Sequence, residues 1–401
     1  MTCRICGALT RRILDLGESP PANALLEARE VEPRTFPLVL ELCDECGNLQ
    51  LRDCLDAVDL YRHYLYVTPD SAMLRQHYES LHAYLASGNY IRPDSFVLEV
   101  GSNAGLFLQF LKPRTGKVLG IDPAINICEM ARASGIDTVC DFFATDSAQA
   151  IREQHGVPDL IVARHCMAHN ADPHVMVSAA AELLTDNGHL VIENAYGLTT
   201  VENNEFDQIY HEHMFYFTIR SMKALLARNG MHLTGIFMSP VHGGSIVFVA
   251  KKKRPGDRVD VSVEQFSRRE DDLLRPGTFE RFTQNAYEIK AHLTSLVGDL
   301  IADQKSVWTY GATAKGNTLL NYVGLTHQQI GNCVDSTPIK QGKFLPKSGI
   351  RVVSEEEATA SPPDFYLLTA WNYKHEVIEK VRRSGNNHTR FIIPVPHVHI
   401  V

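Results

Sequence analysis

FVLEVGSNAG, at residues 96–105, places a continuous apolar run directly before a glycine-rich turn. A short apolar run that ends at a glycine is typical of a strand that is buried on both faces. The helical pattern LFLQFLK follows at residues 106–112. This order predicts a strand, a tight turn and a helix, which is the opening unit of an α/β domain.

The same alternation continues for almost a hundred residues. Further strand-like runs lie at 118–122, near Thr138, at 159–164 and at 189–194, and helix-like runs lie at 127–133 and 175–184. Alternating strands and helices form a parallel sheet with helices on both faces, and ligands bind at the carboxyl ends of its strands. We therefore predict a doubly wound, Rossmann-like α/β domain here.

The turn after the first strand carries residues that suit a nucleoside. Gly101 and Gly105, with Asn103 between them, let the backbone approach a ligand closely. Glu99 precedes this turn, and Asp122 ends the second strand, where an acid accepts both ribose hydroxyls. The dinucleotide fingerprint has its first two glycines one residue apart, so the G-x-x-x-G spacing makes NAD the weaker interpretation. A plain tight turn in another doubly wound domain is the alternative.

Four of the nine cysteines form two C-x-x-C knuckles, Cys3 with Cys6 and Cys43 with Cys46. Two knuckles at this separation are typical of a zinc ribbon, and the alternative is four unrelated buried cysteines. Four protein thiolates leave no position open for water, so the zinc is expected to be structural. The remaining cysteines are expected to be reduced core residues.

The segment FDQIYHEHMFYFT, at residues 206–218, is the richest in titratable groups. Within seven residues it carries Asp207, Tyr210, His211, Glu212 and His213. The order H-E-H is not the H-E-x-x-H of a catalytic zinc site, so general acid–base chemistry is the better hypothesis. A polar surface helix is the alternative.

The last third predicts a second α/β unit. Helical patterns interrupted at residues 275–277 precede a strand at 306–310 and the turn GATAKG at 311–316. Thr313 stands where the dinucleotide fingerprint needs its second glycine, which argues against NAD. The helix start and Lys315 could instead bind a diphosphate, or Lys315 could be an ordinary exposed lysine.

Six motifs taken together resemble one enzyme family. They are the cysteine knuckles, EVGSNAG, FDQIYHEH, PVHGGS at 240–245, YGATAKGNT at 310–318 and AWN at 370–372. The chain resembles the C-methyltransferases that act on nucleotide-linked 4-keto-deoxysugars, including the C-3 methyltransferase of tetronitrose biosynthesis. The resemblance implies three domains: a zinc module at 1–70, an S-adenosylmethionine methyltransferase domain at 71–260 and a Rossmann-like substrate domain at 261–401.

The resemblance also implies roles for individual residues. Candidate catalytic residues are Tyr64, His169, Tyr210, Glu212 and His213. Candidate cofactor residues are Glu99, Gly101, Asn103, Gly105, Asp122, Asp141, Phe142, Phe143 and His165; the Asp-Phe-Phe segment matches the place where such enzymes hold adenine. Candidate substrate residues are His242, Lys315, Trp371 and Asn372. His165 stands where the family has asparagine, which leaves the substituent on the methylated carbon open.

The expected reaction begins at a carbon acid. A 4-keto group acidifies the hydrogen on the adjacent carbon, and the resulting enolate can attack the methyl group of S-adenosylmethionine. His213 is the predicted base with Tyr210 as its partner or rival, Glu212 orients, and His169 or Tyr64 faces the keto oxygen. An O- or N-methyltransferase and a non-catalytic zinc-ribbon scaffold are the alternatives.

Composition narrows the classes of partner. The 401 residues carry 39 Lys+Arg against 47 Asp+Glu, a formal net charge of -8, without a long basic stripe, so we expect no nucleic acid. Neither a spanning apolar run nor a signal peptide is evident, which predicts a soluble, cytoplasmic protein that does not bind membranes. A monomer that binds a TDP- or GDP-linked sugar is the expected state.

Overall fold

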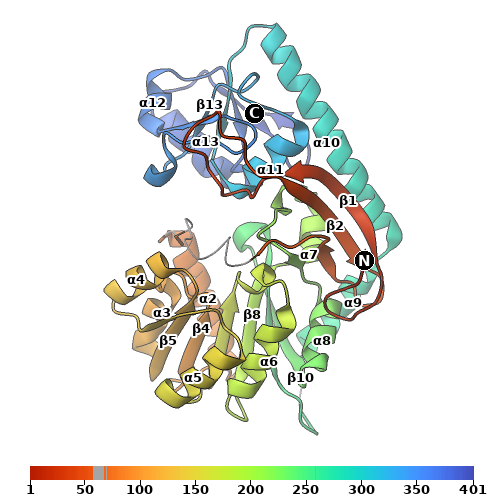
Figure 1. Cartoon of the computed structure of the whole chain (residues 1–401), viewed down its shortest axis with the longest axis vertical. Coiled ribbons are helices and arrows are strands. Elements are labelled where there is room, and N and C mark those ends of the chain that lie inside the picture. The colour runs from red at the N-terminus through yellow and green to blue at the C-terminus, as the bar shows by residue number, and fades with distance from the viewer. Residues whose placement is uncertain (57–66, 69, 258) are drawn as a thin grey trace.

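The computed structural model describes residues 1–56, 67–68, 70–257 and 259–401, without the side chain of His242. The described residues form three sheets (Figure 1). Within the described residues, no helix combines the length and the apolar character that a bilayer crossing requires. The predicted α/β fold class is confirmed.

The central sheet contains seven strands in the order β10-β11-β8-β7-β4-β5-β6. Its strands are β4 (Phe96–Val100), β5 (Lys117–Asp122), β6 (Thr138–Cys140), β7 (Leu160–Arg164), β8 (His189–Ala195), β10 (Met231–Ser239) and β11 (Ser245–Lys252). β4 to β8 run parallel to one another. β11 is antiparallel to β8, and β10 is antiparallel to β11. The strand order reverses between β4 and β7, which is where a doubly wound sheet binds its ligand.

Helices cover both faces of this sheet because its central strands are apolar on both sides. In β7, Leu160 and Val162 face the cluster of helices α2 and α3, whereas Ile161 and Ala163 face the cluster of α6 and α8. The helices are α2 (Ala72–Ser87), α3 (Leu106–Leu111), α4 (Ile125–Ala133), α5 (Thr145–His155), α6 (Pro173–Leu183), α7 (Gly197–Glu202), α8 (Ile219–Arg228) and α9 (Val261–Leu273).

The amino-terminal sheet has the order β1-β2-β3-β9. Its strands are β1 (Thr10–Ser19), β2 (Phe36–Cys43), β3 (Leu49–Leu51) and β9 (Phe215–Tyr216). β9 comes from the middle of the chain and pairs with β3 through Leu49 and Tyr216. The amino-terminal sheet therefore fixes the segment that directly follows His213.

The carboxyl-terminal sheet has the order β14-β13-β12-β15-β16-β17, and only β17 is antiparallel. Its elements are β12 (Val307–Tyr310), α11 (Ala314–Val323), β13 (Asn332–Val334), β14 (Arg351–Val353), α12 (Glu355–Ala360), β15 (Phe365–Leu368), α13 (Lys374–Arg383), β16 (Arg390–Ile393) and β17 (His399–Ile400). The switch point lies between β12 and β15. There Gly311, at φ 106°, leaves no room for a Cβ, which would lie 2.7 Å from the Cβ of Ala370.

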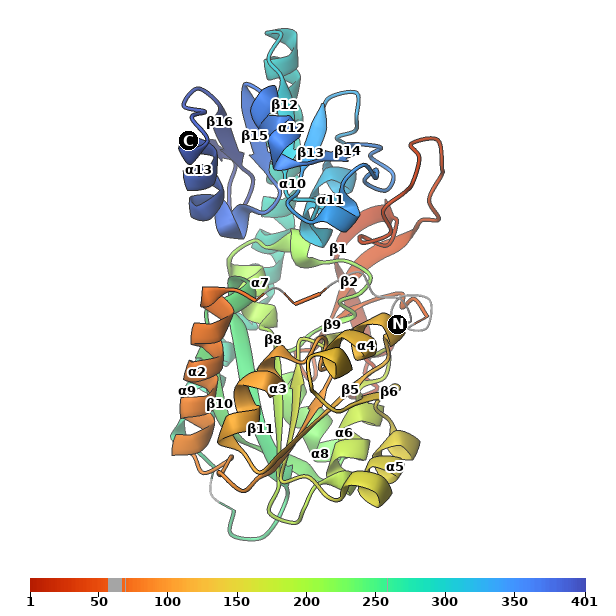
Figure 2. The same cartoon turned by 90° about the vertical axis from the view of Figure 1, so that its left-hand side faces the viewer.

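Two segments connect the sheets. Helix α10 (Pro276–Ala302) runs along the β1–β2 hairpin, where Thr283 donates to the carbonyl of Ile13 at 2.8 Å (Figure 1). The loop between β1 and β2 reaches the carboxyl-terminal sheet (Figure 2). The division at residues 70 and 260 stays a prediction. Helix α9, which begins directly after residue 260, packs against β10 of the central sheet.

Candidate active site

The glycine-rich turn sits where the central strand order reverses. Gly101 adopts φ 64°, and a Cβ at this position would lie 2.6 Å from the Cβ of Cys166, which follows β7. Gly105, at φ 78°, caps the start of α3. The backbone of Thr68 donates to the side-chain oxygen of Asn103 at 2.9 Å. A side chain at position 101 is thus excluded by its neighbours as well as by its backbone angle.

Two acidic side chains flank this turn. Asp122 accepts from the backbone of Asn103 and of Ala124, each at 3.0 Å, and burial raises its pKa. Glu99 is buried and accepts from Arg164 at 3.0 and 2.8 Å. Burial raises the pKa of Glu99 to about 7, while Arg164 opposes that rise. Each Asp122 oxygen keeps a second lone pair, so the residue fits ribose hydroxyls while holding the turn.

The predicted adenine segment divides between surface and core. Asp141 is exposed and accepts from the backbone of Phe142 at 2.8 Å. Phe142 is half-buried, whereas Phe143 is 5% exposed and belongs to the main apolar core. Of the two rings, Phe142 is thus the more exposed.

His165 belongs to a buried polar chain that sequence reasoning missed. Its Nε2 lies 3.7 Å from Oε1 of Glu193, which is fully buried on β8. The same oxygen lies 2.8 Å from Nε2 of His77, whose Nδ1 is 3.0 Å from the hydroxyl of Ser239. Both histidines keep the pKa of Glu193 well below its usual value against the effect of burial. One signal was available: Glu193 directly follows the apolar run Leu190–Ile192 of β8.

The candidate catalytic histidines lie together. The hydroxyl of Tyr210 is 2.8 Å from Nε2 of His213, and the rings of His213 and His169 stack with centroids 5.2 Å apart. Burial, followed by the charges of His169, His165 and Lys315, lowers the pKa of His213 well below its usual value. Burial likewise lowers the pKa of His169 to about 4. Both imidazoles are therefore neutral at pH 7 and able to accept a proton.

Glu212 is held by a residue that the sequence did not suggest. It is 4% exposed, and both of its oxygens accept from the side-chain amide of Asn23 at 2.8 Å. The neighbouring His211 is buried, with Nε2 3.3 Å from the carbonyl of Pro37 in β2. Predicted Tyr64 and the side chain of His242 lie outside the described residues.

The predicted substrate residues of the carboxyl-terminal unit lie beside the loop at 206–213, which carries the candidate catalytic residues. Lys315 lies over the ring of Trp371 at 4.9 Å, and Trp371 donates to Asp207 at 2.6 Å. The ammonium of Lys315 is buried, and no described residue accepts a hydrogen bond from it. Asn372 is half-buried beside Trp371. A buried ammonium without an acceptor is costly, so an anionic ligand would stabilise it.

The four knuckle cysteines converge. Their sulfur atoms all lie within 4.8 Å of one another, with Cys3 and Cys46 at 3.6 Å and Cys6 and Cys43 at 3.4 Å. Tetrahedral zinc–thiolate geometry requires sulfurs about 3.8 Å apart, so the set fits Zn²⁺. Bound zinc would supply a cross-link between the two knuckles.

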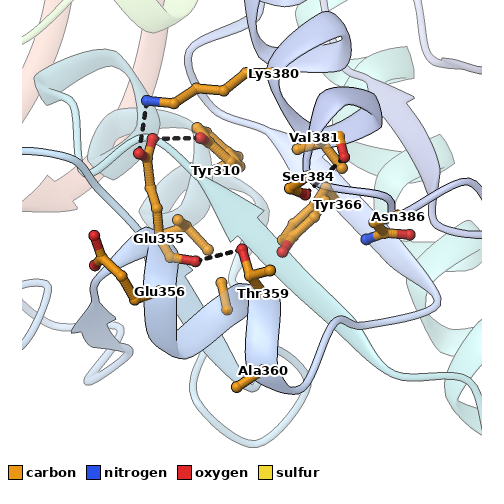
Figure 3. A pocket seen from close by; sticks show the side chains of 12 residues that line it. Tyr310, Glu355, Glu356, Thr359, Ala360, Tyr366, Lys380, Val381, Ser384 and Asn386 are labelled. Atoms are coloured by element: carbon orange, nitrogen blue, oxygen red, sulfur yellow. Dashed lines mark hydrogen bonds and ion pairs between the residues drawn. The ribbon is translucent and has the colours of Figure 1, made fainter.

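A separate groove of about 500 Å³ lies between α12 and α13 (Figure 3). Glu355 spans it by accepting from Tyr310 at 2.6 Å and pairing with Lys380 at 2.6 Å. None of the sequence-predicted site residues that the structure describes lines this groove. It is therefore distinct from the candidate active site.

Three family models match successive parts of the chain. They are described as "Putative zinc binding domain" at residues 3–61, "Methyltransferase domain" at 72–234 and "C-methyltransferase C-terminal domain" at 240–396. The C-methyltransferase NovU of Streptomyces niveus is 33% identical over 404 aligned positions, which cover 100% of this chain and 96% of that protein. The chain belongs to this C-methyltransferase family. It is an S-adenosylmethionine-dependent enzyme with a zinc-binding module, as the sequence motifs predicted.

Two solved structures match this C-methyltransferase over less than half of its length. Magnesium protoporphyrin IX methyltransferase of Synechocystis PCC 6803 is 18% identical, with a TM-score of 0.34 over 45% of this chain and 80% of its own. A methyltransferase from Clostridium acetobutylicum is 12% identical, with a TM-score of 0.36 over 46% and 94%. The individual residue roles in this C-methyltransferase remain predictions.

Replacing Gly101 by Ala should weaken S-adenosylhomocysteine binding at least about tenfold. The added Cβ meets Cys166 and also strains a left-handed backbone, at a cost of about 1–2 kcal/mol from the backbone alone. Isothermal calorimetry measures the change. Gly135→Ala is the matched control, because Gly135 has φ 79° and open space around it. Equal binding by the two variants would contradict the assigned turn.

Removing the zinc site should destabilise the C-methyltransferase. Cys43→Ser is expected to abolish zinc retention and to lower the unfolding midpoint by about 5 °C or more, since each kcal/mol moves the midpoint of a domain of 150–250 residues by about 2–4 °C. Metal analysis and differential scanning calorimetry measure both. Cys54→Ser, a cysteine outside the cluster, is the control. A Cys43 variant that retains zinc and its midpoint would refute the site.

Proposed function

We propose that the enzyme methylates a nucleotide-linked 4-keto-6-deoxysugar, carried by TDP or GDP, at the C-3 carbon beside the ketone. The observation that carries this proposal is the buried ammonium of Lys315 at the start of α11, close enough to His213 to lower its pKa. Amides at a helix start together with a lysine suit a diphosphate. The same neighbourhood thus offers an anion site and a neutral base for one substrate.

The proton leaves the sugar carbon for the Tyr210–His213 pair. The two side chains share one hydrogen bond, so the proton reaches Nε2 of His213 either directly or by relay, in which the tyrosine oxygen takes the proton from the carbon as it passes its own to the imidazole. A neutral His169, stacked on His213, can donate its N–H to the enolate oxygen. Bound S-adenosylmethionine supplies an electrophilic methyl group.

The acidic residues suit the cofactor. Asp122 would accept hydrogen bonds from the ribose hydroxyls, and the Glu99–Arg164 pair would support the glycine-rich turn. Trp371 and Asn372 would contact the sugar or its diphosphate beside Lys315. Holding both reactants in line removes much of the entropic cost of their meeting, which is worth several kcal/mol.

The sugar identity is tested by mass spectrometry. Incubation with S-adenosylmethionine and a panel of TDP- and GDP-linked 4-keto-6-deoxysugars should add one methyl to at least one of them. The same sugars reduced at C-4 are the controls, because they lack the acidic carbon. Methylation of the reduced sugars would instead indicate transfer to oxygen or nitrogen.

The assigned base is tested without the methyl donor. In deuterium oxide, the wild type should exchange the hydrogen beside the ketone, and H213A with Y210F should slow that exchange by about 10²–10⁴-fold, the usual contribution of a general base. NMR follows the exchange. His388→Ala, at an exposed histidine, is the control. Wild-type exchange in the double variant would show that another group removes the proton.

A further inference from the structure

We propose that the loop between β1 and β2 of the zinc module, residues 20–35, is a strap that positions Glu212 through Asn23. The strap also connects Glu212 to the carboxyl-terminal unit, which is proposed to bind the substrate. Asn23 is then a positioning residue for methyl transfer. This inference rests on the proposed roles of Glu212, His213 and Lys315. It assigns to the amino-terminal module a part in arranging the active site, beyond holding a metal.

The first observation is the contact of Asn23 with Glu212. A single side-chain amide donates to both oxygens of a nearly fully buried carboxylate, each at 2.8 Å. Hydrogen bonds to a charged group are about twice as strong as neutral ones. Glu212 directly precedes His213, so the orientation of one backbone segment determines both side chains.

The second observation is that the strap also grips the carboxyl-terminal unit. The carbonyl of Ala22 accepts from Asn317 in α11 at 2.6 Å, two residues beyond Lys315. Leu26 and Phe344 exchange two backbone hydrogen bonds, of 2.9 and 2.8 Å. Ala22 thus contacts α11, the helix that carries Lys315, and the adjacent Asn23 contacts the loop that carries His213.

Further contacts fix the far end of the strap. Arg29 donates to the carbonyl of Gly349 at 3.1 Å, and Glu27 pairs with Lys343 at 2.8 Å. Figures 1 and 2 both show the loop lying against the carboxyl-terminal sheet. Both ends of the loop continue into β1 and β2, whose sheet contains β9. The strap, β9 and α11 are therefore anchored to one another, and together they set the distance between His213 and Lys315.

Asn23→Asp tests the strap, because it keeps the shape and replaces the donor with a second carboxylate. Hydrogen–deuterium exchange of the segment at 206–216 should be at least about tenfold faster in this variant, since local opening becomes easier. Glu30→Gln is the control: Glu30 is an exposed carboxylate on the same loop. If Asn23→Asp exchanges like Glu30→Gln, the strap does not hold this segment.

Catalysis gives the second readout. Asn23→Asp should lower kcat by about 10–100-fold and change KM and zinc content little, because the loss falls on alignment of the base. The double variant N23D/E212Q exchanges donor and acceptor between the two positions. It should recover slow exchange of the segment at 206–216. A double variant whose segment exchanges as fast as that of N23D would overturn the proposal.

The two hypotheses fail in different ways. If no keto sugar is methylated by the wild type, the proposed function fails, whereas the segment exchange of N23D, E30Q and N23D/E212Q still decides the strap. If the wild type is active and N23D matches it in kcat and in segment exchange, the strap fails alone.

Discussion

Burying an ionised side chain costs several kcal/mol unless a partner stabilises its charge, and this constraint joins the parts of the molecule. Four buried acids find a partner in a distant segment: Glu99 pairs with Arg164, Glu193 with His77, Asp207 with Trp371, and Glu212 with Asn23. The last two partners come from the carboxyl-terminal and amino-terminal units. The active-site loop at 206–213 is thus satisfied only when all three sheets have assembled.

The same burial determines what the histidines can do. His213 is half-buried, and burial together with the nearby ammonium of Lys315 disfavours its protonated form. A neutral imidazole is ready to accept a proton, and the positive charge of Lys315, which helps to lower the pKa of His213, would also favour an enolate. In the proposed mechanism, one ammonium would thus act on both the base and the oxyanion. An exposed histidine would be a stronger base in water but would lack this environment.

The zinc module contributes because its strands connect the metal site to the loop at 206–213. Its second knuckle, Cys43 with Cys46, lies between β2 and β3, and β3 pairs with β9, which begins two residues after His213. The opposite end of the β1–β2 hairpin carries Asn23 to Glu212. A structural metal can in this way influence the catalytic loop from both sides without entering the chemistry.

The sequence by itself determined the fold class, the four-cysteine site and the family. Apolar runs broken by glycines reveal buried strands, and thiolate spacing reveals zinc, because both signals are local in the chain. Six motifs in order were enough to predict the methyltransferase. Local patterns also brought His213 and Tyr210 to attention, though they could not say that the pair shares a hydrogen bond.

Only the tertiary structure decided which distant side chains meet. Asn23, His77 and Glu193 carry no motif, and nothing in the spacing of the chain predicts that Asn23 reaches Glu212 or that Lys315 lies over Trp371. Phe142 and Phe143 look alike in sequence, but packing makes one a core residue and leaves the other half-buried. The physical reason is that partner choice depends on how the three sheets pack, and packing is fixed by contacts between residues far apart in sequence.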